Sequence, residues 1–164
     1  MKIKTILTIF IAAFVLQTLH EIEHIAQVYQ RLWLGVGPEQ AHGILFFLDV
    51  EWNHFLFNLA YFTLLSVLLF IVLSAPDLKA SIQSQKLGKL GWRIFTLGFL
   101  IQGYHVLEHT VRMGQFFQFD CTPCPGILGN FFDIAYLHFI FNTTTWLLPI
   151  AILPALLKLC RLRK

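Results

Sequence analysis

The chain has 164 residues, of which 57% are hydrophobic and 13% charged, and its formal net charge is +3. This composition is too apolar and too weakly charged for a soluble domain. The basic residues form short clusters without an aromatic stacking platform, which excludes a nucleic-acid-binding protein. We therefore expect an all-α integral membrane protein that has membrane lipid as its solvent.

Four stretches are long and apolar enough to cross a bilayer, which takes about 20 residues. They are residues 5–28, 52–75, 92–111 and 134–157. Glycines and prolines fall between them, and Pro149 and Pro154 predict a bend within the fourth. The sequence thus predicts one membrane domain over residues 1–164 with four transmembrane helices.

A polar stripe runs along the second half of the first span. Four side chains share one face of the helix at spacings of three, three and one: Gln17, His20, Glu23 and His24. Ionisable groups at this depth are costly and by default mark function. The stretch also matches the HExxH motif of zinc metalloproteases, but the related stripe of the third span lacks a counterpart of Glu21, so we do not expect a peptidase.

The second span opens with His54 and Asn58, an i, i+4 pair that lies on one face of the helix. We interpret His54 as a metal ligand and Asn58 as a hydrogen-bond partner of the ligands. Asp49 comes just before this helix. A carboxylate there serves equally well as a helix cap or as a ligand.

The third and fourth spans repeat these patterns position for position. The third carries the stripe again and the fourth carries the pair: Gln102, His105, Glu108 and His109, then Asp133, His138 and Asn142. The loops match as well, with Gly43 echoed by Gly126. We interpret the chain as two duplicated helical hairpins, repeat 1 (5–75) and repeat 2 (92–157), related by a pseudo-twofold axis along the membrane normal.

Most basic residues flank the spans on the side away from these motifs. They are Lys2, Lys4, Lys79, Lys86, Lys89, Arg93, Lys158, Arg161, Arg163 and Lys164. By the positive-inside rule we expect a multi-pass protein of the plasma (inner) membrane with both termini in the cytoplasm. Cys121 and Cys124 then lie in an outward loop, where they form a disulfide if that side is oxidising.

The polar residues that the repeats share predict a transition-metal site. Its expected ligands are His20, Glu23, His24, His54, His105, Glu108, His109 and His138, with Gln17, Asp49, Asn58, Gln102, Asp133 and Asn142 around them. Imidazole and carboxylate ligands suit iron, zinc, manganese or copper. Two matched sets predict two ions, as in four-helix bundles with dinuclear carboxylate centres. Haem between facing histidines is the alternative cofactor.

Three functions fit such a site. The first is a metal-dependent oxidoreductase or hydroxylase that acts on a lipophilic small molecule entering from the membrane. The clustered histidines resemble the histidine boxes of membrane fatty-acid desaturases and hydroxylases in single motifs, although the chain has no HxxHH box. The second is a metal or proton transporter, which the lack of titratable groups in the inner halves of the spans disfavours. The third is a haem-b electron carrier, which the paired glutamates disfavour.

Overall fold

The computed structural model describes residues 3–37, 40–44 and 51–162, and it is 85% helix with no strand in this part of the chain. The elements in chain order are α1 (Ile3–Trp33), α2 (Glu51–Leu73), α3 (Pro76–Gln83), α4 (Lys86–Phe119), η3 (Leu128–Asn130), α5 (Ile134–Leu147), η4 (Leu148–Ile152) and α6 (Leu153–Leu162). The all-α fold class predicted from the sequence is confirmed.

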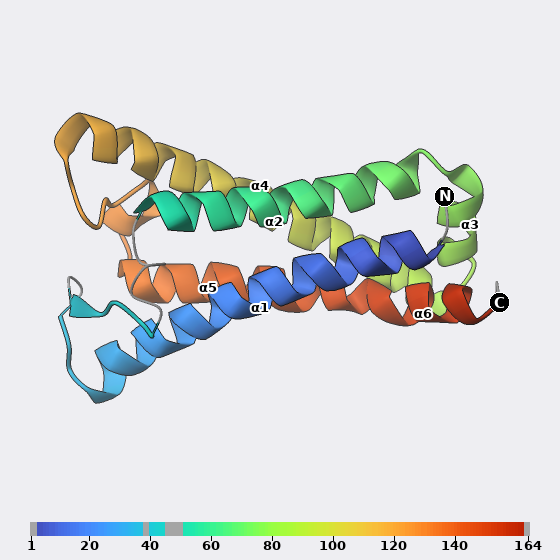
Figure 1. Cartoon of the computed structure of the whole chain (residues 1–164), viewed down its shortest axis with the longest axis horizontal. Coiled ribbons are helices and arrows are strands. Elements are labelled where there is room, and N and C mark those ends of the chain that lie inside the picture. The colour runs from blue at the N-terminus through green and yellow to red at the C-terminus, as the bar shows by residue number, and fades with distance from the viewer. Residues whose placement is uncertain (1–2, 38–39, 45–50, 163–164) are drawn as a thin grey trace.

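The long helices run side by side along the longest axis of the molecule (Figure 1). Helix α1 packs on α2 and α5, and α4 packs on α2, α5 and η4. The chain begins and ends at one end of the molecule, where α3 connects α2 to α4, and the two long loops lie at the other end (Figure 1). The histidine motifs lie in the half of the molecule that faces those loops.

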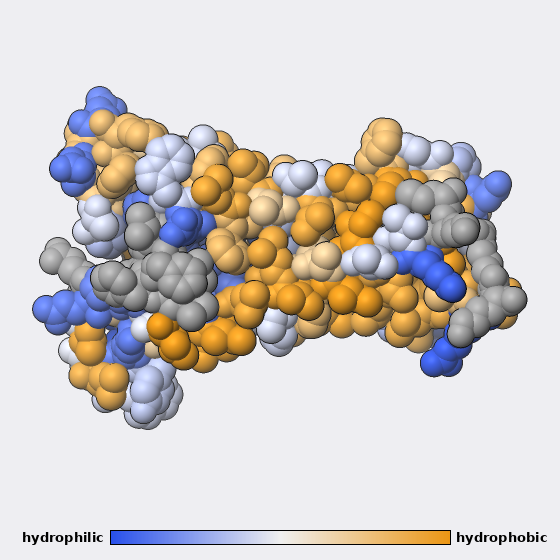
Figure 2. Space-filling model, viewed as in Figure 1, coloured by the Kyte–Doolittle hydropathy of each residue, from blue (hydrophilic) through white to orange (hydrophobic). Residues whose placement is uncertain are grey.

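Three helical segments are long and apolar enough to cross a membrane within the described residues: Ile3–Trp33, Glu51–Leu73 and Ile134–Leu162. Helix α4 contains the third expected span and is 34 residues long, but it is not among the three. Its expected span includes two glycines and the whole second stripe from Gln102 to His109, which lower its mean hydropathy. The surface of the middle of the molecule is apolar (Figure 2), as lipid contact requires.

Proline breaks the last helical segment where the sequence predicted a bend. Pro149 lies in the first turn of η4, a 3₁₀ segment between α5 and α6, because proline cannot donate an α-helical hydrogen bond. Glycines on α4 let its backbone approach this segment. A Cβ at Gly98 would lie 3.0 Å from the Cβ of Leu148, and one at Gly91 would collide with the carbonyl of Ala151, a close contact that small residues favour in membrane helix pairs.

The interior is divided along the long axis. Toward the end that holds the termini it is a packed apolar core, which includes Ile6, Phe10, Leu65, Leu68, Phe95, Ile152 and Leu156. Toward the loops it is polar, and its fully buried side chains include four histidines, two glutamines and two glutamates. The molecule is therefore apolar outside and, in one half, polar inside, which is the inverse of a soluble helical protein.

Candidate metal centre

Six histidines from four helices form one buried layer in the polar half. They are His20 and His24 from α1, His54 from α2, His105 and His109 from α4, and His138 from α5, and none is more than 6% exposed. Ring centroids of neighbouring histidines lie 4.6 to 6.2 Å apart. The helices place the rings together because an i, i+4 pair projects from one face of each stripe.

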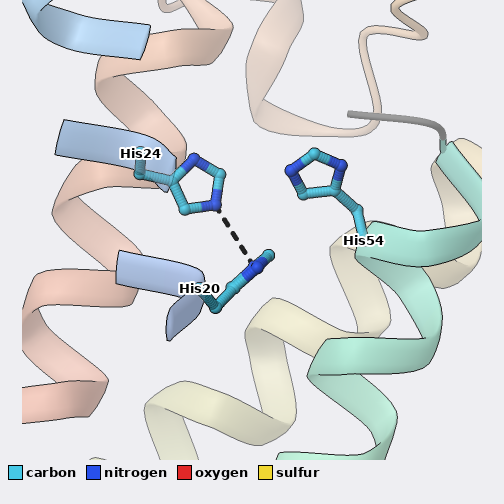
Figure 3. A group of neighbouring side chains, drawn as sticks. All are labelled: His20, His24 and His54. Carbon is cyan, nitrogen blue, oxygen red and sulfur yellow. Dashed lines mark hydrogen bonds between the residues drawn. The ribbon is translucent and has the colours of Figure 1, made fainter. Parts of the chain in front are cut away.

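Three of these histidines form a group that can hold a metal ion. One ring nitrogen from each of His20, His24 and His54 lies within 4.8 Å of the others. Figure 3 shows the two rings of α1 one above the other, with the ring of His54 reaching toward them from α2. Three imidazoles that converge on one point are a common ligand set for zinc, copper or iron.

Hydrogen bonds outside the group fix the orientation of two of its rings. Nδ1 of His24 lies 2.8 Å from Oε1 of Gln27. Because an amide oxygen can only accept, Nδ1 carries the proton, and the lone pair of Nε2 faces Nε2 of His20 at 3.2 Å, where it can accept a proton or bind a metal ion. The amide nitrogen of Asn58 lies 3.3 Å from Nε2 of His20 and orients that ring, while Nδ1 of His20 has no hydrogen-bond partner among the described residues.

An amide layer beneath the histidines joins α1 to α5 and α4 to α2. Gln17 Nε2 donates to Asn142 Oδ1 (2.8 Å), and Gln102 Nε2 donates to Asn58 Oδ1 (3.0 Å). Asn142 in turn lies 3.3 Å from Nε2 of His105, the same distance as between Asn58 and His20. Each glutamine therefore supports an asparagine of the other repeat, and each asparagine supports a histidine of its own repeat.

The histidines of repeat 2 are equally close together but are contacted differently. His105 and His109 lie 4.7 Å apart between ring centroids, and His109 and His138 lie 4.9 Å apart. The guanidinium of Arg112 lies 2.7 Å from Nε2 of His138 and forms an ion pair with Glu51 at 2.5 Å. Among the described residues, His105, His109 and His138 do not form a metal-holding group of the kind that His20, His24 and His54 form.

The two glutamates expected as ligands bind loop amides in the structure. Glu108 Oε1 accepts from the amides of Ile127 (2.8 Å) and Leu128 (2.9 Å), and Glu23 Oε2 accepts from Ile44 (3.2 Å). A role of either carboxylate as a metal ligand stays a prediction.

Loop glycines make room for these carboxylates. Gly43 and Gly126 have φ of +74° and +69°, and a Cβ on either would collide with the carboxylate of Glu23 or Glu108, respectively. Gln30 and Gln115 hold the same glycines by hydrogen bonds to both the amide and the carbonyl. Both loops are thus fastened to the helix ends by the same pattern of contacts. Neither glutamine belongs to the site predicted from the sequence, although the two share the 85-residue spacing of the stripes.

The capping interpretation of the loop aspartates is supported at one of the two positions. Asp133 is the N-cap of α5, where it accepts from the amide of Ala135 (3.0 Å), and it pairs with Arg31 at 2.6 Å. Asp49 lies outside the described residues. Cys121 and Cys124 form a disulfide, one of the outcomes that the sequence left open.

A small cavity connects the histidine layer with the loops. Its volume is about 80 Å³, and its lining includes His54, His138, Gln27, Glu51, Arg112 and Ala135. A molecule of a few atoms can therefore approach His54, one of the three histidines of the metal-holding group. The cavity is also bordered by Thr122 and Pro123 of the disulfide loop.

No protein-family model, curated protein or solved structure matches this chain. The assignment of the site therefore rests on its geometry and on the sequence repeats.

Proposed function

We propose that this chain is an integral membrane metalloprotein that binds a transition-metal ion through His20, His24 and His54. The observation that supports this most strongly is the convergence of three ring nitrogens within 4.8 Å in a buried site. Burying three imidazoles together without a shared ligand is costly, and a metal ion would satisfy their lone pairs. Iron, copper, zinc and manganese are the candidate metals.

We further propose that α1, α2, α4 and the α5–η4–α6 segment all cross the bilayer. Four spans are supported by the length of α4, which packs along α2. The pseudo-twofold relation is supported by the paired contacts of the amide layer and of the loop glycines. The clustering of basic residues at the end that holds the termini favours cytoplasmic termini, with the metal in the outer half of the bundle.

The cavity favours a reaction between the metal and a small molecule. Its volume of about 80 Å³ gives access to the metal through His54, which a storage site does not need. We therefore propose a metal-dependent oxidoreductase as the class of activity, with a substrate or oxidant of a few atoms. The lipophilic substrate expected from the sequence has no cavity of matching size beside the histidines in the described part of the molecule.

Transport is less well supported, because the inner half of the interior is tightly packed. The cavity among Ile6, Phe10, Leu68, Phe95 and Leu156 has a volume of only about 10 Å³. An ion that left the histidine layer would meet apolar side chains there, whereas membrane relays use polar or titratable groups along their path.

Haem does not fit the histidine layer in this conformation. A bis-histidine haem needs two rings on opposite sides of a flat macrocycle. The six rings instead contact one another directly, with neighbouring centroids 4.6 to 6.2 Å apart, and the adjoining cavity is far smaller than a porphyrin.

Elemental analysis of the purified protein tests the proposal. We expect at least about one iron, copper, zinc or manganese ion per folded chain, lost in His20→Ala, His24→Ala and His54→Ala. Tyr29→Ala is the matched control, because it removes a ring from the exposed face of the same helix α1 and should keep the metal. A folded wild-type protein that binds none of these metals after incubation with each would contradict the proposal.

A further inference from the structure

At two of the positions of the cavity wall where the repeats differ, residues of the two repeats contact each other. The spacing of the stripes aligns Gln27 with Arg112, and the spacing of His54 and His138 aligns Glu51 with Ala135. Arg112 and Glu51 form a buried ion pair at 2.5 Å, with side chains 6% and 4% exposed. Each member of this pair therefore has a different residue at the corresponding position of the other repeat.

The arginine of the ion pair restricts the ability of His138 to bind a metal ion. Arg112 Nη1 lies 2.7 Å from Nε2 and 3.1 Å from Nδ1 of His138. An arginine only donates hydrogen bonds, so it takes up a lone pair that a metal would need. Its positive charge, buried beside the ring, also repels a second cation.

The same substitution affects His109. In repeat 1 the oxygen of Gln27 accepts from Nδ1 of His24 and fixes its tautomer. Arg112 has no acceptor to offer His109, and neither ring nitrogen of His109 has a hydrogen-bond partner among the described residues. Repeat 2 therefore lacks an oriented counterpart of His24, and its counterpart of His54, His138, lies against a guanidinium.

We propose that Arg112 is a built-in cation that takes the place of a second metal ion and restricts the centre to one metal, bound by repeat 1. This inference rests on the metal site proposed above and deepens it. Glu51 balances the charge of Arg112 and is itself held by the amide of Cys124 at 3.1 Å. The cation thereby becomes a fixed part of the cavity wall beside the bound metal.

Co²⁺ binding to the full chain in detergent tests this inference, because the visible spectrum of Co²⁺ reports its ligands. We expect about one Co²⁺ per wild-type chain and about two in Glu51→Ala/Arg112→Gln, which replaces each member of the ion pair by the residue at the corresponding position of the other repeat. Arg112→Lys is the matched control, since it keeps the charge and should stay at about one. Circular dichroism and gel filtration check that each variant is folded.

The reciprocal variant provides a second test. Gln27→Arg/Ala135→Glu places an equivalent ion pair on the other side of the cavity, beside His54, and we expect it to abolish Co²⁺ binding. Two Co²⁺ per wild-type chain, one in the folded Glu51→Ala/Arg112→Gln variant, or full binding in the folded reciprocal variant would each overturn the inference and leave the proposed metalloprotein intact. No Co²⁺ in the wild type would overturn both.

Discussion

His24 and His109 occupy corresponding positions in the two repeats, yet their surroundings differ. His24 has Gln27 as a hydrogen-bond acceptor at 2.8 Å, whereas His109 has no such partner among the described residues. The ring separations are nearly equal, at 4.6 Å for His20–His24 and 4.7 Å for His105–His109. The comparison shows that the spacing of the rings is kept while the side chain at one position changes their hydrogen bonding, and on our proposal this change decides whether a metal binds.

The largest effect should come from the two corresponding histidine variants. His24→Ala removes a proposed ligand and should weaken Co²⁺ binding by more than about 100-fold, since losing only a ligand's hydrogen-bond partner costs about 10- to 100-fold. His109→Ala should weaken it by less than about tenfold. Titration with Co²⁺ measures both. Equal losses would show that the repeats share one centre, as the sequence predicted.

The buried ion pair of Arg112 should contribute more to the stability of the protein than the hydrogen bond of Gln27 at the corresponding position of repeat 1. Arg112→Gln leaves Glu51 buried without its cation and should cost about 3 to 5 kcal/mol of unfolding free energy. Adding Glu51→Ala should recover much of this loss, because the uncompensated charge is gone. Gln27→Ala should cost only about 1 kcal/mol, the value of one hydrogen bond.

Denaturant unfolding in detergent, followed by circular dichroism, measures these differences. Additive effects of Arg112→Gln and Glu51→Ala would argue that the two side chains do not interact.

The glutamates should have a smaller effect. Glu108 accepts two loop amides at 2.8 and 2.9 Å, and Glu23 accepts the amide of Ile44 at 3.2 Å. Glu108→Gln and Glu23→Gln should therefore each lower the unfolding free energy by about 1 to 3 kcal/mol. Both variants should keep their metal, measured by elemental analysis. Loss of metal in both would establish the carboxylates as ligands.

The two long loops should behave alike in a labelling experiment. Cysteines placed at Gln40 in the first loop and Asn130 in the second should react with an impermeant thiol reagent in intact cells, in a Cys160→Ser background. A cysteine at Ser84, beside α3, should be protected. Opposite behaviour of the two loops would rule out an even number of spans between them, and labelling at Ser84 alone would reverse the orientation.

The sequence could predict the helices and the histidine layer for a simple reason. An apolar run of about 20 residues has few alternatives to a membrane helix, and the helical period alone puts His20 beside His24 and His54 beside Asn58. Buried amides need hydrogen-bond partners, so the sequence could place the glutamines and asparagines around the histidines, but it did not predict that Gln17 pairs with Asn142 and Gln102 with Asn58.

Other parts of the site have no signal of this kind. Arg112 and Glu51 are 61 positions apart, and their contact depends on how α2 and α4 are rotated against each other. The glutamates bind backbone amides, which any residue type supplies. The spacing of the glutamates in the sequence therefore cannot predict whether they contact a loop or a metal ion. Helix α3 was also not predicted, although Pro76 in its first turn is a favourable start.

The position of the bound metal tests the central claim most directly. Anomalous scattering from crystals of the metal-loaded protein, collected at the absorption edge of that metal, would locate it without assumptions about ligands. We expect one peak, within bonding distance of His20, His24 and His54, with Arg112 still against His138. A peak among His105, His109 and His138, or no peak in the histidine layer, would contradict the account.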